Sequence, residues 1–78
     1  MAKNKFIDLN IADRRYPLRI DPSEEEEILK ASKIINDKIL SYRKMFTGRD
    51  DQDFLAMAAI DLAKQLLELR KEKDIDPS

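Results

Sequence analysis

The chain has 78 residues and a formal net charge of −1, with 42% hydrophobic and 40% charged residues. That length allows one domain with a marginal core, which in small proteins is often supported by disulfides, a metal or oligomerisation. The sequence has no cysteine and no histidine, which excludes disulfides, thiolate nucleophiles, zinc–imidazole sites and the usual general base. Oligomerisation is therefore the expected source of added stability.

The composition also bears on where the chain resides. It is too apolar for a disordered tail, and its longest apolar run, which ends at Ile60, is far shorter than the roughly 20 residues that cross a bilayer. The first five residues include two lysines but are followed by no long apolar stretch, so no secretory signal is visible. We expect a cytoplasmic protein that spans no membrane.

Alternation of apolar and polar residues predicts a β-hairpin over residues 6–20. The turn is expected at residues 12–15, where Asp13 tolerates a left-handed backbone. Pro17 has no N–H group, so it should face away from the partner strand. A lone hairpin is not stable, so its apolar face should lie on a helix. That face is expected to comprise Ile7, Leu9, Ile11, Leu18 and Ile20.

A first helix is predicted over residues 22–46. Asp21 has the position of an N-cap, Pro22 is a favoured first helical residue, and Glu24 follows at capping-box spacing. Gly48, the only glycine, suits a C-terminal cap, so residues 47–50 form the predicted turn. The apolar stripe of this helix is expected to comprise Ile28, Leu29, Ala31, Ser32, Ile35, Ile39, Tyr42 and Phe46, widened by Ile34 and Leu40.

A second helix is predicted from a cap at Asp50 or Asp51 to about Lys73, followed by a frayed tail over residues 74–78. Apolar residues recur along it at alternating steps of four and three, the pattern of helices that pack lengthwise. One small domain has too little surface to cover all of them, so the helix is expected to form a dimer. The predicted interface is Leu55, Ala59, Leu62, Leu66 and Leu69.

The sequence gives little support to a metal site or to a catalytic site. Asp50, Asp51 and Asp53 lack the ordered ligands and central glycine of a calcium loop, so they are interpreted as helix-capping residues. No pair of carboxylates is placed for acid–base catalysis, and an enzyme is not expected.

Positive charge is concentrated in the first part of the chain. Residues 1–49 carry 11 basic and 8 acidic side chains, and residues 50–78 carry 4 basic and 8 acidic side chains. Because the whole chain is slightly acidic, nucleic-acid binding is not favoured, although a small DNA-binding dimer stays open as an alternative.

The chain resembles one known family in its hairpin, its acid-capped first helix and, most specifically, the run Ala56-Met57-Ala58-Ala59-Ile60-Asp61-Leu62-Ala63. It is similar to ZapA, the Z-ring-associated cell division protein of bacteria, over about residues 5 to 73. It departs from the family pattern at Asp13, where glycine is usual, and at Asp61, where asparagine is usual. Since Asp61 puts a charge near a packed surface, we expect it to be exposed or paired.

The resemblance implies an α+β fold, mostly α, with a short β-hairpin packed on two helices, the second of which extends into a dimeric coiled coil. A head over residues 1–53 would carry the hairpin and the first helix, and residues 54–78 would form a dimerisation helix and tail. The implied partner is FtsZ, the tubulin-like division GTPase, whose protofilaments the family cross-links at the division site. No cofactor or small-molecule substrate is implied, and the assembly would be a dimer or a tetramer. A generic helical dimerisation module for another scaffold is the main alternative.

The resemblance also implies where the partner would dock. FtsZ polymers are expected to be acidic, so the expected docking residues are the basic side chains at the two turns: Arg14, Arg15, Arg43, Lys44 and Arg49. The more apolar groove of the dimer near Phe54 and Met57 is the alternative docking site.

Overall fold

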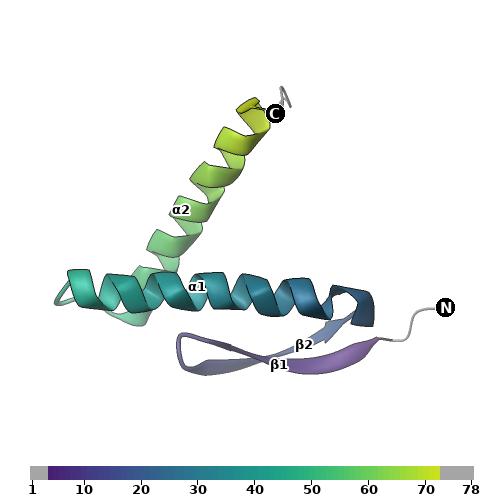
Figure 1. Ribbon diagram of the computed structural model, residues 1–78. Helices are drawn as coiled ribbons and strands as arrows, with labels where there is room; N and C mark the ends of the chain where they lie inside the picture. Colours follow the sequence, from purple (N-terminus) through teal and green to yellow (C-terminus); the bar gives the residue numbers. More distant parts are fainter. Residues whose placement is uncertain (1–3, 73–78) are drawn as a thin grey trace.

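The structure, a computed structural model, describes residues 4–72, so the predicted tail at 74–78 lies outside the described residues. Two strands, β1 (Lys5–Ile11) and β2 (Arg14–Ile20), are followed by a 3₁₀ turn, η1 (Pro22–Glu24), and two helices, α1 (Glu25–Met45) and α2 (Asp51–Glu72). The predicted α+β, mostly α architecture is confirmed. In Figure 1, α1 lies along the hairpin, and α2 crosses α1 near its own start and then leads away from the head.

The hairpin turn is tighter than predicted. Strands β1 and β2 pair antiparallel from Lys5↔Ile20 to Ile11↔Arg14, which leaves only Ala12 and Asp13 between them. Both turn residues have positive φ, 54° and 64°, as a two-residue turn that matches strand twist requires. Arg14 and Arg15 were expected in the turn. They are instead the first two residues of β2, because the left-handed turn at Ala12 gives no signal in the sequence.

Pro17 lies opposite Asp8 in the strand register. In a two-residue hairpin, the pair next to the turn is hydrogen-bonded, and pairs then alternate between bonded and non-bonded. Counted from Ile11↔Arg14, the pair Asp8↔Pro17 is non-bonded, so the missing N–H group of proline removes no hydrogen bond from the ladder. The predicted placement of Pro17 agrees with this register.

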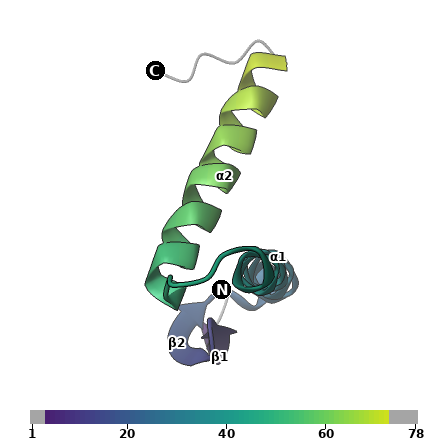
Figure 2. The same ribbon diagram turned by 90° about the vertical axis from the view of Figure 1, so that its left-hand side faces the viewer.

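One face of the hairpin packs on α1, although less of it than predicted. Leu9 and Ile20 are buried, at 6% and 8% exposure, and Ile7 and Ile11 are half-buried. Leu18 was expected under the helix but is 37% exposed, and Tyr16 on the same face is 40% exposed. A single helix covers only part of a two-stranded sheet, so the β2 side of this face stays open (Figure 2).

The start of the first helix follows the prediction. Asp21 is extended, and its carboxylate accepts hydrogen bonds from the backbone N–H and the hydroxyl of Ser23, at 3.0 and 2.9 Å. These bonds lower the pKa of Asp21. Pro22 opens the 3₁₀ turn that leads into α1. A local capping motif therefore fixes where the hairpin ends and the helix begins.

The apolar stripe of α1 is narrower than predicted. Ile39 is only 1% exposed, and Ile35 and Tyr42 are half-buried beside it. Leu29, Ile34 and Leu40 were expected to belong to the stripe. They are 46%, 51% and 52% exposed, because the hairpin and the start of α2 contact only one side of the helix.

The second helix begins at Asp51, with Asp50 as its cap. The Asp50 carboxylate accepts from the backbone N–H of Asp53 at 3.0 Å. The helix is in contact with the head mainly at its start, where Phe54 is 3% exposed and Ala58 is 1% exposed. The radius of gyration is 15.2 Å, against about 11.5 Å for a compact domain of this length. The far half of α2 is thus not part of the core of the single chain.

The hairpin, α1 and the start of α2 share one core, and the term head refers to these three parts of the structure. Ala12 from the hairpin turn, Ile39 from α1 and Phe54 from α2 form one buried cluster. The rings of Tyr42 and Phe54 have centroids 6.2 Å apart. This cluster fixes the angle at which α2 leaves the head.

Candidate protein-interaction surfaces

An ion-pair cluster joins the hairpin turn, α1 and α2 around Arg43. The Arg43 Nε donates to Asp51 Oδ1 at 2.9 Å. The Arg43 Nη2 donates to Asp51 Oδ2 at 2.7 Å and to Asp13 Oδ2 at 3.2 Å. The hydrogen bonds from Arg43 lower the pKa of Asp51. A bidentate arginine–carboxylate pair has a defined geometry, so Arg43 orients α2 against the head.

Asn36 holds the hairpin onto α1. Its side-chain oxygen accepts from the backbone N–H of Ala12 at 3.0 Å, and its Nδ2 donates to the carbonyl of Asn10 at 2.7 Å. The amide therefore bonds the outer edge of β1 as a third strand would. Lys5 and Glu25 add an ion pair of 2.7 Å at the opposite end of the hairpin. The orientation of the hairpin on α1 is thus fixed at both ends.

Asp61 is paired, as expected for a charge beside a packed surface. Lys38 on α1 donates to its carboxylate, and Gln65 donates at 3.1 Å. The hydrogen bond from Lys38 lowers the pKa of Asp61, and that same bond raises the pKa of Lys38. This ion pair is a second polar link between the two helices.

The residues of the predicted dimer interface lie along one side of α2, as their spacing at 100° per residue requires. Leu66 and Leu69 are 48% and 53% exposed. Leu55 and Leu62 are half-buried, and Ala59 is exposed. We call this set, Leu55, Ala59, Leu62, Leu66 and Leu69, the leucine seam. Within residues 4–72, nothing covers its distal half.

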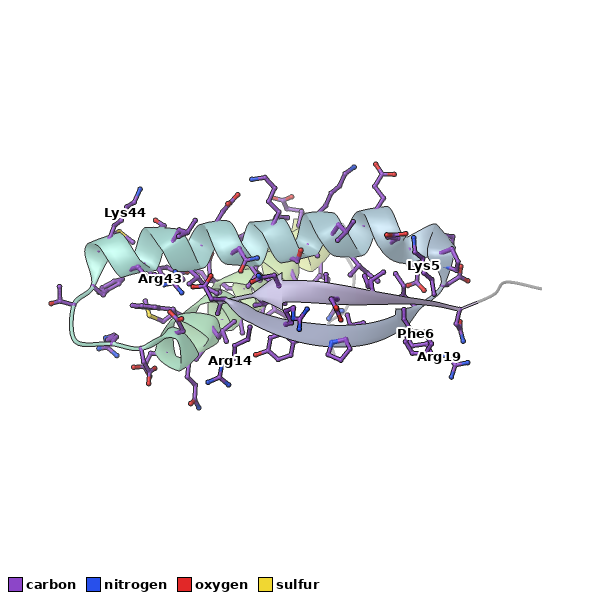
Figure 3. All side chains as sticks on the ribbon, turned by 90° about the horizontal axis from the view of Figure 1, so that it is seen from below. Lys5, Phe6, Arg14, Arg19, Arg43 and Lys44 are labelled. Carbon is purple, nitrogen blue, oxygen red and sulfur yellow. The ribbon has the colours of Figure 1, made fainter. Side chains whose placement is uncertain are left out.

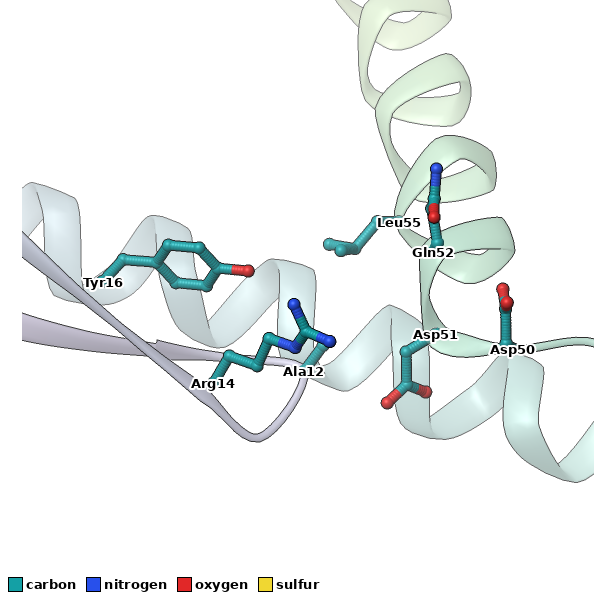
Figure 4. A pocket seen from close by; sticks show the side chains of 7 residues that line it. All are labelled: Ala12, Arg14, Tyr16, Asp50, Asp51, Gln52 and Leu55. Carbon is teal, nitrogen blue, oxygen red and sulfur yellow. The ribbon is translucent and has the colours of Figure 1, made fainter.

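The leucine seam ends at a cavity of about 460 Å³ between β2 and the start of α2. Figure 4 shows Tyr16 and Arg14 reaching from β2 toward Leu55 and Gln52 on α2. Since Tyr16 and Leu18 are exposed on the same hairpin face, apolar surface extends from the helix onto the open part of the sheet. The available face is larger than the five seam residues predicted from sequence.

The five basic residues expected at the docking site do not share one face. Arg14 and Arg15 are consecutive in β2, so their side chains point to opposite sides of the sheet. Arg15 lies 3.9 Å from Asp8 on the outer side, whereas Arg14 lines the cavity beside α2. Arg43 lies between α1 and the hairpin turn, while Lys44 points away on the other side of α1 (Figure 3). Arg49 is exposed in the loop between the helices.

Several residues that shape these surfaces were missed from sequence. Asn36 was not singled out, although an amide among the apolar residues of a helix is a signal for a specific polar contact. Ile60 and Leu67 are exposed outside the leucine seam, at 70% and 45%. On the outer face of the hairpin, the Arg19 guanidinium lies 5.8 Å from the centroid of the exposed Phe6 ring. Cross-element contacts of this kind leave little trace in local patterns.

Comparison with known families agrees with this architecture. The family model described as "Cell division protein ZapA" matches residues 7–78, nearly the whole chain. The chain belongs to the ZapA family. No curated protein and no solved structure matches it. As a member of the ZapA family, the chain is a cell division protein. In the described part of the chain, no helix has the length and apolar character to cross a membrane.

Proposed function

We propose that this ZapA-family protein is a dimeric adaptor that binds FtsZ and cross-links its protofilaments at the division site in the cytoplasm. The observation that carries the proposal is the uncovered leucine seam on α2 of a chain from a cell division family. The adaptor has no catalytic step and takes no cofactor. Its role is to place two binding heads on one particle.

The dimer is supported by the surface of the single chain. Its accessible surface is 6572 Å², whereas a compact protein of 9.1 kDa exposes about 4,900 Å². Part of the apolar surface lies on α2, where Leu66, Leu67 and Leu69 are about half exposed. Each leucine buried against a partner contributes about 1.5–3 kcal/mol. Two leucine seams packed together remove this apolar surface from water, and a tetramer is the larger assembly that the family implies.

Cross-linking follows from having two heads. A second head bound to a neighbouring protofilament acts at a high effective concentration, so a dimer holds two polymers without any new type of contact. The proposed docking residues remain Arg14, Arg15, Arg43, Lys44 and Arg49. Arg43 is already bonded to Asp13 and Asp51, so the exposed cations on β2, α1 and the loop are expected to contribute more.

Co-sedimentation with FtsZ polymers tests this function. The wild-type protein should pellet with FtsZ assembled with GTP, and binding should weaken as salt rises from about 50 to 300 mM, where the screening length falls from about 14 to 6 Å. Charge reversal at Arg14 and Arg15 should abolish bundling and leave the dimer intact, since both side chains are exposed. A wild-type protein that stays in the supernatant at low salt would refute the proposed function.

A further inference from the structure

A groove of about 540 Å³ lies between α1 and α2, on the side of the head away from the leucine seam. Its apolar lining is Tyr42 from α1 and Met57 and Ile60 from α2. Ile60 is 70% exposed, so much of its side chain is available to a bound molecule. Four polar side chains form the rest of the lining: Lys38, Ser41, Asp61 and Lys64.

The position of the groove on α2 keeps it open in the proposed dimer. Met57 comes two residues after Leu55, and Lys64 comes two residues after Leu62. Two residues turn an α-helix by about 200°, so the groove residues point away from the leucine seam. A dimer joined through the seam therefore presents two grooves, one on each protomer.

The groove is preformed, because a polar contact spans its two walls. Lys38 on α1 donates to Asp61 on α2, and Gln65 donates to the same carboxylate at 3.1 Å. Ring packing of Tyr42 against Phe54, with centroids 6.2 Å apart, also holds α1 against the start of α2. Binding there needs little ordering of the protein, which favours affinity.

The charges of the groove indicate the chemistry of its occupant. Two lysines and one aspartate line it, and Lys38 compensates Asp61. Lys64 makes no ion pair within residues 4–72, although its charge also helps to lower the pKa of Asp61. The two lysines and one aspartate leave the lining with one net positive charge. One net positive charge beside an apolar floor fits a carboxylate next to a large apolar side chain, whereas a polyphosphate backbone requires several cations.

We infer that this groove binds a peptide segment of the cross-linked protein in which a large apolar side chain stands next to an acidic one. The inference rests on the proposed function, in which that protein is FtsZ. The exposed basic residues then speed encounter and account for salt dependence, while the groove supplies the apolar contact that slows dissociation.

The inference is tested by substituting one apolar and one charged groove residue, Ile60→Ser and Lys64→Glu. The matched controls are Leu29→Ser and Lys30→Glu on exposed parts of α1 outside the groove. Half-saturation concentrations are measured by high-speed co-sedimentation with FtsZ polymers, at about 50 and 300 mM salt. Light scattering on each variant reports whether the dimer persists.

Both groove variants should bind about tenfold or more weakly with the dimer intact, and the controls should bind within about twofold of wild type. The loss caused by Ile60→Ser should be similar at both salt concentrations, because it removes an apolar contact. If wild type binds and the groove variants match it, or if the controls weaken equally, the groove inference fails alone. Dissociation of the dimer by Ile60→Ser would make this face a contact between copies and also overturn it. A wild type that does not bind FtsZ refutes the proposed function and, with it, the inference.

Discussion

The head and the distal half of α2 differ in how their apolar residues are covered. In the head, Ala12, Ile39 and Phe54 are each at most 9% exposed, and polar contacts from Asn36 and Arg43 join the three elements around them. In the distal half of α2, Leu66 and Leu69 are about half exposed. Both regions have helical apolar periodicity, but only the head supplies its own partners. The same sequence pattern thus marks a core in one region and an uncovered apolar face, the proposed interface, in the other.

Disruption of the leucine seam should have the largest effect. Leu62→Asp removes an apolar contact worth about 1.5–3 kcal/mol from each protomer and places two carboxylates in an apolar interface. The variant should be a folded monomer at micromolar concentration, as measured by light scattering and circular dichroism. Leu29→Asp, on an exposed part of α1, is the control and should remain dimeric. A Leu62→Asp protein with the mass of a dimer would show that the seam is not the interface.

Loss of a core side chain in the head should have the second-largest effect. Ile39 is 1% exposed and contacts both the hairpin turn and α2. Ile39→Ala should reduce the free energy of unfolding by about 2–5 kcal/mol, because the neighbours cannot fully close the cavity. Denaturant unfolding of dimeric wild type and variant at equal protein concentration measures the difference. A change below about 1 kcal/mol would contradict the assignment of Ile39 to the core.

Removal of the amide that holds the hairpin should have a smaller effect. Asn36→Ala leaves the N–H group of Ala12 without its partner, and that group is partly buried. The expected cost is about 1–3 kcal/mol. Hydrogen exchange should show faster exchange at Ala12 than in wild type, with little change in the distal half of α2. Equal protection of Ala12 in both proteins would show that the Asn36 contact does not hold the turn.

Acid should lower the stability of the head by a modest amount. The pKa values of Asp51 and Asp61 are lowered by hydrogen bonds from Arg43 and Lys38. Their stabilising contribution is therefore present at neutral pH, and it is lost as the pH falls from about 5 through the lowered native pKa values. Thermal melts from pH 7 to 3 should show this loss, and Asp61→Asn should reduce it. A melting temperature unchanged between pH 5 and 3 would contradict these assignments.

The sequence predicted the parts of the fold that depend on local signals. The strand alternation, the Asp21–Pro22 cap, the Asp50 cap and the apolar period of α2 all act within a few residues. Their outcomes agree with the structure, apart from the left-handed turn at Ala12, which no local rule assigns to alanine. Tertiary features were less accessible, because the burial of Leu18, Ile34 and Leu40 depends on how much surface one hairpin covers.

For the candidate surfaces too, features of a single element were accessible from the sequence, and features that join several elements were not. The leucine seam is a property of one helix, and its role as a dimer interface stays a prediction. The basic residues of the predicted docking site do not share one face. Strand alternation separates Arg14 from Arg15, and Arg43 is bonded to Asp13 and Asp51. The groove between α1 and α2 needs both helices in place. Phe54, which was expected beside a groove of the dimer, lies in the core of the single chain.

The central claim is that two heads joined by α2 cross-link FtsZ polymers, and one comparison tests it most directly. Wild type and Leu62→Asp are mixed with FtsZ polymers and centrifuged at low speed, which pellets only bundles, and at high speed, which pellets single polymers as well. Wild type should bring FtsZ into both pellets, whereas the monomeric variant should appear in the high-speed pellet with bound polymer and produce no bundles at low speed. Bundling by the Leu62→Asp monomer at the wild-type level would contradict the account.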